Sequence, residues 1–290
     1  MEKAEGKRQK AKGKRQALAS LFKAPSFLHF CRLPFAVCLL LFCSLACRSR
    51  ALLDQAQQSF DNRDYTGAIN QYEEFLKKNP NHEQAAFAHF QLGNIYLLIL
   101  KDKQYDKAVT QYVQVIESSP RSPYLLQARQ RLAKSYAGLN KRREAITEYE
   151  NLLKVFPETP DRRRVRLDIA DLYFDQNDLS QARVEYEKVT KDAVFDSLTE
   201  RAWLQIGGVC VLLNDLEDAI PAYVVVVAKS SDPENRRRAR LLLADCYQRT
   251  LQFEEAIKTL EQTDPDPKNP DDLKRRIAAI HDLQKQRGLP

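Results

Sequence analysis

A repeat of 37 residues constrains the fold of this chain more than any other feature. Alanines recur at this interval from residue 108 to residue 256, and Ala68 stands 40 residues before the first of them. Each alanine is followed four positions later by a tyrosine, except that Leu260 takes this place in the last repeat. The alanines are Ala108, Ala145, Ala182, Ala219 and Ala256, and the tyrosines are Tyr72, Tyr112, Tyr149, Tyr186 and Tyr223. A fixed period of this size indicates stacked supersecondary units that share one long core.

A second row of residues precedes the alanines. It consists of Leu or Ile, then Gly or Ala, then an aromatic residue or cysteine three positions further on, and its small residues are Gly93, Ala133, Ala170, Gly207 and Ala244. In most repeats 12 residues separate this small residue from the alanine, but 15 separate Gly93 from Ala108. Both rows have the spacing of one helix face, so each repeat predicts two short helices. The small residues allow a close approach of the backbones, and the tyrosines fill the gap between neighbouring units.

These motifs resemble those of the tetratricopeptide repeat (TPR) family. Leu-Gly/Ala-x-x-Tyr is followed by Ala-x-x-x-Tyr, and then by a proline 12 residues after the alanine at Pro80, Pro120 and Pro157. The usual TPR period is about 34 residues, so three residues are added between units here. This longer variety is similar to the repeats of the BamD (YfiO) and YbgF/CpoB families of bacterial envelope proteins. The resemblance covers residues 51–263 and implies an all-α, TPR-like α-solenoid of about six helical hairpins.

The repeats define the expected domain organisation. We expect a solenoid over 51–263, with hairpins at approximately 51–80, 83–120, 122–157, 160–192, 197–230 and 233–263. Three prolines between residues 264 and 270 then interrupt the pattern. A helix over 271–287 follows, and we expect it to cap the solenoid, so that residues 264–290 form a Pro-rich link and a capping helix.

The positive net charge of +7 belongs to the N-terminal region. Eleven of the 46 basic residues but only two of the 39 acidic residues lie within residues 1–50, which leaves the remainder with a net charge of −2. The sequence pI of about 9.0 therefore does not indicate a nucleic-acid-binding surface, and we expect no nucleic-acid partner.

The N-terminal region has the organisation of an export signal. A basic segment is followed by an apolar run over 33–46, which is too short to cross a bilayer as a helix. The run ends in Ala46-Cys47 and resembles a bacterial lipobox, which implies that Cys47 is acylated and becomes the new N-terminus. We therefore predict a signal segment over 1–46, an acylation site and short tether over 47–50, and a lipid anchor. Cleavage after Ala46 without acylation and a short signal anchor are the alternatives.

No residues support catalysis. Four of the six cysteines lie in the N-terminal region, and Cys210 and Cys246 stand beside the aromatic row, where we expect small buried hydrophobic residues without a disulfide. The histidines of the repeats have no second ligand at metal spacing, and no phosphate-binding loop or nucleophile motif occurs. We interpret Gly207-Gly208 as a helix-packing pair. The chain is predicted to be a non-enzyme without a cofactor or metal.

The candidate binding residues follow from the repeat register. TPR solenoids curve, and their first helices line the concave groove. Positions six before and one after the small residue should face this groove. The first position holds Phe87, Gln127, Arg164, Arg201 and Arg238, and the second holds Asn94, Lys134, Asp171, Gly208 and Asp245. The three arginines predict a ladder that binds an acidic or C-terminal-carboxylate peptide through bidentate contacts. Pairing with neighbouring acidic residues, or solvation, is the alternative.

The N-terminal half of the groove has a different character. Phe87, Phe90, Leu97 and Leu98 indicate an apolar wall suited to an extended or helical segment, with burial against the first hairpin as the alternative. The predicted partner-binding groove thus comprises Arg164, Arg201, Arg238, Asp171, Asp245, Phe87, Phe90 and Asn94.

Two functional hypotheses follow. The first is a lipid-anchored, non-catalytic scaffold on the periplasmic face of the outer membrane, which binds protein or peptide ligands in outer-membrane assembly or envelope maintenance; a secreted or soluble periplasmic protein is its variant. The second is a cytosolic TPR adaptor or co-chaperone that binds peptide termini. Such adaptors use Lys and Asn on the first helices, whereas the first hairpin here offers Asp54 and Gln55, and an apolar run has no role in a soluble tail.

Overall fold

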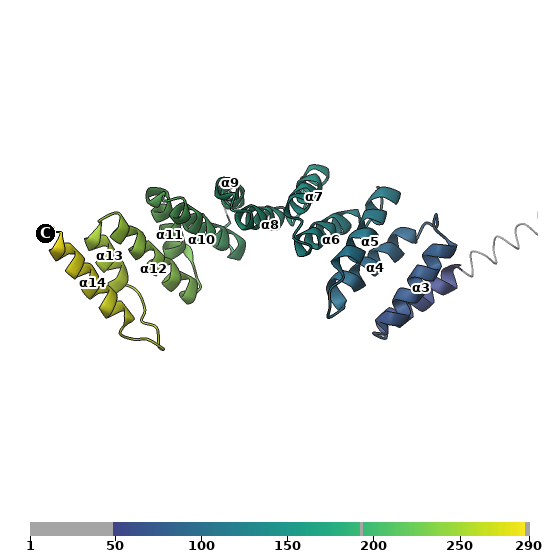
Figure 1. The fold of residues 1–290 in the computed structure, drawn as a ribbon, viewed down its shortest axis with the longest axis horizontal. Helices are drawn as coiled ribbons and strands as arrows, with labels where there is room; N and C mark the ends of the chain where they lie inside the picture. The colour runs from purple at the N-terminus through teal and green to yellow at the C-terminus, as the bar shows by residue number, and fades with distance from the viewer. Residues whose placement is uncertain (1–48, 192–193, 288–290) are drawn as a thin grey trace, which may run out of the picture. The chain divides into compact units, whose positions relative to one another are not determined.

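The computed structural model describes residues 49–191 and 194–287 of the chain (Figure 1). These residues form helices joined by short loops, and the one β-bridge among them pairs Asp266 with Asn269. The predicted all-α class is therefore confirmed. The chain divides into two compact units, residues 1–82 and residues 83–290. Each unit is described separately below.

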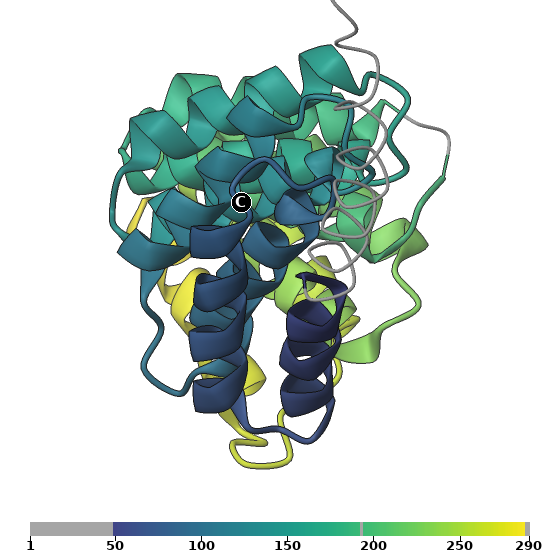
Figure 2. The same cartoon turned by 90° about the vertical axis from the view of Figure 1, so that its right-hand side faces the viewer.

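The described part of the first unit is one helical hairpin. A helix over 49–61 lies beside α3 (Tyr65–Lys78), as Figure 2 shows. The two alanines that face each other across the hairpin, Ala56 and Ala68, are completely buried. The hydroxyl of Tyr72 donates a hydrogen bond to Oε1 of Gln57 at 2.9 Å, so this tyrosine connects the second helix of the hairpin to the first.

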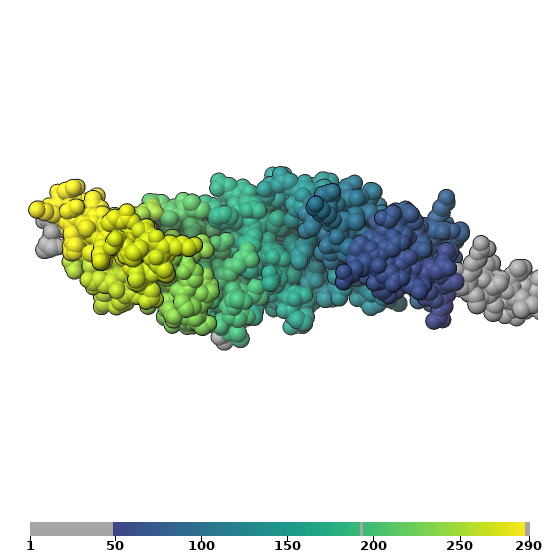
Figure 3. Space-filling model, turned by 90° about the horizontal axis from the view of Figure 1, so that it is seen from below, coloured from purple at the N-terminus to yellow at the C-terminus, as the bar shows by residue number. Residues whose placement is uncertain are grey.

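The described residues of the second unit form five helical hairpins and a final helix. The hairpins pair α4 (Ala85–Asn94) with α5 (Tyr105–Ser118), α6 (Leu125–Gly138) with α7 (Arg142–Val155), α8 (Arg162–Asp175) with α9 (Leu179–Thr190), α10 (Ser197–Leu212) with α11 (Leu216–Lys229), and α12 (Pro233–Arg249) with α13 (Phe253–Glu261). The last helix is α14 (Asp272–Gln286). Every helix from α4 to α14 packs on its neighbours in the sequence. The colours of the space-filling view accordingly advance in chain order along this unit (Figure 3).

The two sequence rows build the core of the second unit. The alanines that recur every 37 residues and the tyrosines four positions after them are buried, as are Cys210 and Cys246, whose thiols are free. Tyr136, Tyr173 and Tyr247 of the other row are only partly buried. The tyrosine ring lies against the small residue of its own hairpin. A Cβ added at Gly93 would come within 2.6 Å of the Tyr112 ring, and one added at Gly207 within 2.5 Å of the Tyr223 ring. Glycine is therefore required for these close approaches.

The three extra residues of the second repeat are accommodated by a π-helix. The helix η2 (Ile95–Ile99) continues α4, and a loop leads from it to α5. The amide of Leu100 donates to the carbonyl of Ile95 at 3.1 Å, which is the wide hydrogen-bonding pattern of a π-turn. The spacing of 15 predicted a longer hairpin but not this geometry.

The turn inside each later hairpin needs a left-handed backbone. Asn140, Asn177, Asn214 and Leu251 lie 37 residues apart and have φ between 61° and 63°. Asparagine tolerates this conformation better than other residues with a Cβ, because its short polar side chain bonds locally. Three repeats thus use a residue suited to the turn, and the last repeat places a leucine there.

The predicted signal segment and the acylation site Cys47 lie outside the described residues. Within the described residues, no helix combines the length and the apolar character that a membrane crossing needs.

Candidate binding site

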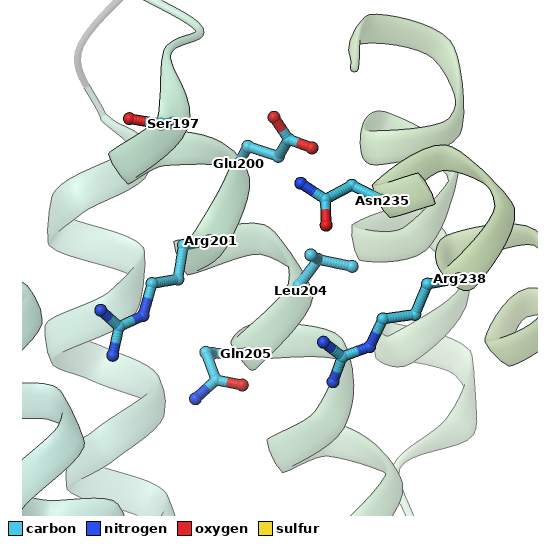
Figure 4. Close-up of a pocket in the computed structure, with 7 residues that line it drawn as sticks. All are labelled: Ser197, Glu200, Arg201, Leu204, Gln205, Asn235 and Arg238. Carbon is cyan, nitrogen blue, oxygen red and sulfur yellow. The ribbon is translucent and has the colours of Figure 1, made fainter. Parts of the chain in front are cut away.

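A cleft of about 400 Å³ opens between α10 and α12 (Figure 4). Both helices are the first helices of their hairpins, and α11 packs against each of them. The cleft is lined by Ser197, Glu200, Arg201, Leu204, Gln205, Asn235 and Arg238. The α10 residues recur every three or four positions and therefore lie on one helix face. This is the place where the structure brings two arginines of the predicted ladder together.

Of the two arginines that line the cleft, Arg201 forms an ion pair with another side chain of the protein. Its guanidinium forms an ion pair with Asp171 on α8, one repeat earlier. The other oxygen of Asp171 accepts a hydrogen bond of 2.7 Å from the hydroxyl of Tyr186 on α9. Burial and the adjacent carboxylate both raise the pKa of Tyr186, so this hydroxyl keeps its proton and remains a donor. Asp171 therefore connects a tyrosine of its own repeat to an arginine of the next.

Arg238 has a different environment. Its side chain is exposed and extends from α12 toward α10 (Figure 4), where it makes no ion pair with the described residues. Burial raises the pKa of Tyr223, and the positive charge of Arg238 lowers it by a smaller amount. Arg238 thus supplies an uncompensated positive charge to the cleft.

The remaining polar groups of the cleft include a carboxylate at one end and two amides. Glu200 is only 8% exposed, and the hydroxyl of Ser230 donates to its Oε1 at 2.7 Å. The amide nitrogen of Gln205 donates to the Tyr186 hydroxyl at 3.4 Å. Asn235 carries the second amide, and Leu204 provides an apolar surface between the charged ends. Sequence reasoning missed Glu200, Leu204 and Gln205, although their spacing from Arg201 on one helix face would have identified them.

Arg164 lies outside this cleft. It is exposed on α8, and with Lys134 it lowers the pKa of Asp168, while burial raises that pKa by a larger amount. Asp168 accepts a hydrogen bond of 3.3 Å from the hydroxyl of Tyr149. Arg164 therefore does not line the cleft that Arg201 and Arg238 share.

Asp245 belongs to a second, smaller cleft of about 330 Å³, whose other lining residues are Val211, Leu242, Cys246, Gln248 and Arg249. Arg276 of α14 donates to Oδ1 of Asp245 at 3.3 Å, and burial raises the pKa of this carboxyl group. The final helix thus gives Asp245 an arginine partner, as α10 does for Asp171. The two predicted acidic residues of the groove therefore hold internal ion pairs.

The predicted apolar wall is an internal contact of the second unit. Phe90 is buried and stacks on Tyr124, with ring centroids 5.0 Å apart. The guanidinium of Arg131 lies over the Phe90 ring, 4.6 Å from its centroid. Phe87 is half-buried, with its ring centroid 5.7 Å from that of Tyr124. Asn94 is buried and accepts hydrogen bonds from Tyr112 at 3.0 Å and from Arg131. Binding of a partner by these residues stays a prediction.

Several arginines beside the ladder pair with neighbouring acids, as the alternative interpretation held. Arg163 donates to both oxygens of Asp196, at 2.9 and 2.5 Å. Arg166 pairs with Glu185 at 3.0 Å, and Arg237 pairs with Glu234 at 3.0 Å. These three arginines do not line the α10–α12 cleft.

The interpretation of Gly207-Gly208 as a packing pair is half wrong. Gly207 packs under the Tyr223 ring, but a Cβ added at Gly208 would meet no atom within 4 Å. Gly208 lies one helical turn beyond Leu204 and Gln205, on the face of α10 that lines the cleft. It therefore leaves open space rather than allowing a close contact.

The groups present in the α10–α12 cleft suit binding. Arginine and primary amide side chains donate to carboxylates and peptide groups in fixed geometry. In the part of the chain that the structure describes, no three His, Cys, Asp or Glu side chains come together as a metal site.

A family model described as tetratricopeptide repeat matches residues 53–124, 131–194 and 167–234, and a second model of that description matches residues 238–263. The chain therefore belongs to the tetratricopeptide repeat family. No curated protein matches it.

The chain is also similar to several solved structures. A tetratricopeptide repeat protein from Parabacteroides merdae is 15% identical, with a TM-score of 0.52 over 82% of this chain and 88% of that chain. The pilF protein of Pseudomonas aeruginosa is 14% identical, with a TM-score of 0.47 over 76% of this chain and 91% of that chain. A putative kinesin light chain of Podosopora anserina is 19% identical, with a TM-score of 0.48 over 71% of this chain and 99% of that chain. The first of these likenesses shows the shared fold.

Proposed function

We propose that this protein is a non-catalytic scaffold of the bacterial cell envelope that binds a segment of a partner protein in the α10–α12 cleft. The observation that carries this proposal is the presence of Arg201 and Arg238, one repeat apart, on a cleft that also holds two side-chain amides. TPR repeats serve protein–protein binding, and first helices present an extended surface for it.

The chemistry of the cleft favours a polypeptide as the ligand. A guanidinium binds a carboxylate through two parallel hydrogen bonds. The amides of Gln205 and Asn235 offer both donors and acceptors, which matches the N–H and C=O groups of a peptide backbone. Leu204 adds an apolar contact between them. A volume of about 400 Å³ accommodates a few residues of an extended chain rather than a whole domain.

Site-specific photocrosslinking in living cells tests the binding site. A photoreactive amino acid at Leu204 should crosslink to a partner protein, since this side chain lines the cleft. The same amino acid at Val184, which is 41% exposed on the second helix α9, is the control. A crosslink from Leu204 but not from Val184 supports the proposal. Equal crosslinking from both positions, or none from Leu204, contradicts it.

The envelope location rests on the N-terminal sequence. The basic segment, the apolar run and Ala46-Cys47 support acylation of Cys47 and attachment to the periplasmic face of the outer membrane. We expect Cys47→Ala to move the protein from the membrane fraction to the soluble fraction, while Cys43→Ala leaves it in the membrane fraction. A native protein found in the cytosol would instead support the adaptor hypothesis.

A further inference from the structure

A polar connection recurs between successive repeats of the second unit. In the repeat of α8 and α9, the Tyr186 hydroxyl donates to Asp171, and Asp171 pairs with Arg201 of the next first helix. In the repeat of α4 and α5, the Tyr112 hydroxyl donates to Asn94, and Arg131 of the next first helix donates to the same oxygen. In both cases the residue after the small residue joins a buried tyrosine to an arginine. Asp171 uses its two carboxylate oxygens and Asn94 uses its one amide oxygen.

The same connection is incomplete in the repeat of α10 and α11. Moving Tyr186, Asp171 and Arg201 forward by the period of 37 residues gives Tyr223, Gly208 and Arg238. The tyrosine and the arginine are present, and the charge of Arg238 acts on Tyr223. The middle residue has no side chain, and the space where its Cβ would lie is open.

We propose that the space over Gly208 is a socket for one acidic side chain of the partner, which binds between Arg238 and Tyr223 in the place of the missing aspartate. This proposal deepens the proposed function and rests on it, because the α10–α12 cleft must be a binding surface. The ligand carboxylate accepts from the guanidinium of Arg238, as Asp171 accepts from Arg201.

The charges around the socket select a single carboxylate. Arg201 is already neutralised by Asp171, so Arg238 contributes the one uncompensated positive charge. The Glu200 carboxyl group also lies on this cleft and adds no positive charge to it. A phosphorylated residue carries a charge of about −1.5 to −2, which the single guanidinium of Arg238 does not balance. Asp or Glu within an extended segment is therefore the expected ligand.

The decisive variant is Gly208→Asp, which supplies the missing carboxylate from within the protein. The open space around Gly208 makes room for it. The full chain, immobilised in detergent, is mixed with peptide libraries that are acetylated and amidated at their ends. The central residue is fixed as Asp, Asn or phosphoserine, and the flanking positions are random. We expect the wild type to retain the Asp library at least fivefold more than the other two.

The variants have distinct expected results. Gly208→Asp and Arg238→Gln should each remove the preference for the Asp library. Arg143→Gln, which removes an exposed charge on α7, should keep it. Retained preference in Gly208→Asp overturns the socket. Circular dichroism and the thermal midpoint establish that each variant is folded.

The results for the socket and for the proposed function are separable. If Leu204 crosslinks to a partner but the libraries show no preference for Asp, the cleft binds a protein and the socket is wrong. If neither experiment gives a signal, the proposed function fails as well. An equal preference for Asp and phosphoserine would show a general anion site and would overturn the selection for a single carboxylate.

Discussion

Adjacent glycines on α10 should respond in opposite directions to substitution by alanine. A Cβ at Gly207 would lie 2.5 Å from both Cε1 and Cζ of Tyr223, and that ring is 1% exposed, so it has no free space to move into. Overpacking of this kind costs about 1–3 kcal/mol, and the higher helix propensity of alanine offsets about 1 kcal/mol. Because other repeats hold alanine at this position, a shift of the helices can relieve part of the clash. We expect a net loss of up to about 2 kcal/mol for Gly207→Ala.

The same substitution one residue later should stabilise the protein. A Cβ at Gly208 meets nothing within 4 Å, so only the change in helix propensity remains. That change favours alanine by about 0.5–1 kcal/mol in a helix interior. For a protein of this size, 1 kcal/mol corresponds to a shift of about 2–4 °C in the thermal midpoint.

Thermal and urea unfolding of both variants, followed by circular dichroism, measure this difference. Because stacked repeats do not always unfold as one unit, hydrogen exchange of the α10 and α11 amides gives the local effect. Gly207→Ala should accelerate exchange there, and Gly208→Ala should slow it. Shifts of the same sign in the two variants would refute the assigned packing of Tyr223 on α10.

Two further predictions concern the turns and an ion pair. Leu251→Asn should stabilise the last hairpin by about 1 kcal/mol, because Leu251 has φ 63° and Asn occupies the equivalent turn of three other repeats; an unchanged urea midpoint, or one equal to that of Leu251→Ala, would contradict this. Arg163 and the Thr199 amide hold the pKa of Asp196 at about 2, below its ordinary value of about 3.9. Since the folded-state pKa is lowered, the stabilisation by Asp196 is complete above about pH 5 and is lost as pH falls toward 2. The difference in thermal midpoint between the wild type and Asp196→Asn should therefore disappear over that range, and a constant difference would show that the charge of Asp196 has no role.

The fold was predictable because the repeat encodes it locally. Ala182 and Tyr186, for example, stand four residues apart and bury one helix face, and the same spacing recurs in every repeat. The π-helix after α4 was not predictable, since three additional residues only require a longer connection and do not specify its hydrogen bonds. The left-handed turns had a signal that could have been used, namely asparagine at 37-residue intervals.

The candidate site was predictable only in part. The register placed Arg201 and Arg238 on one surface, and they do line one cleft. It did not reveal that Asp171 neutralises Arg201, because a pair between residues 30 positions apart depends on how successive hairpins stack. Asn94 illustrates the same limit: its position after the small residue is common to all repeats, but its burial under Arg131 and Tyr112 is a consequence of packing. Gly208 stands at the groove-facing position of the register, but the sequence does not show whether a glycine there allows packing or leaves a space.

The most direct test of the central claim is the affinity of the purified protein for the partner segment that crosslinks to Leu204. Isothermal titration should show at least a tenfold loss of affinity for Arg238→Glu, with a thermal midpoint close to that of the wild type, because the exposed Arg238 makes no ion pair with the described residues. Arg143→Glu, which changes charge equally on α7, should bind as the wild type does. Equal affinity of Arg238→Glu and Arg143→Glu would contradict the claim that the α10–α12 cleft holds the partner.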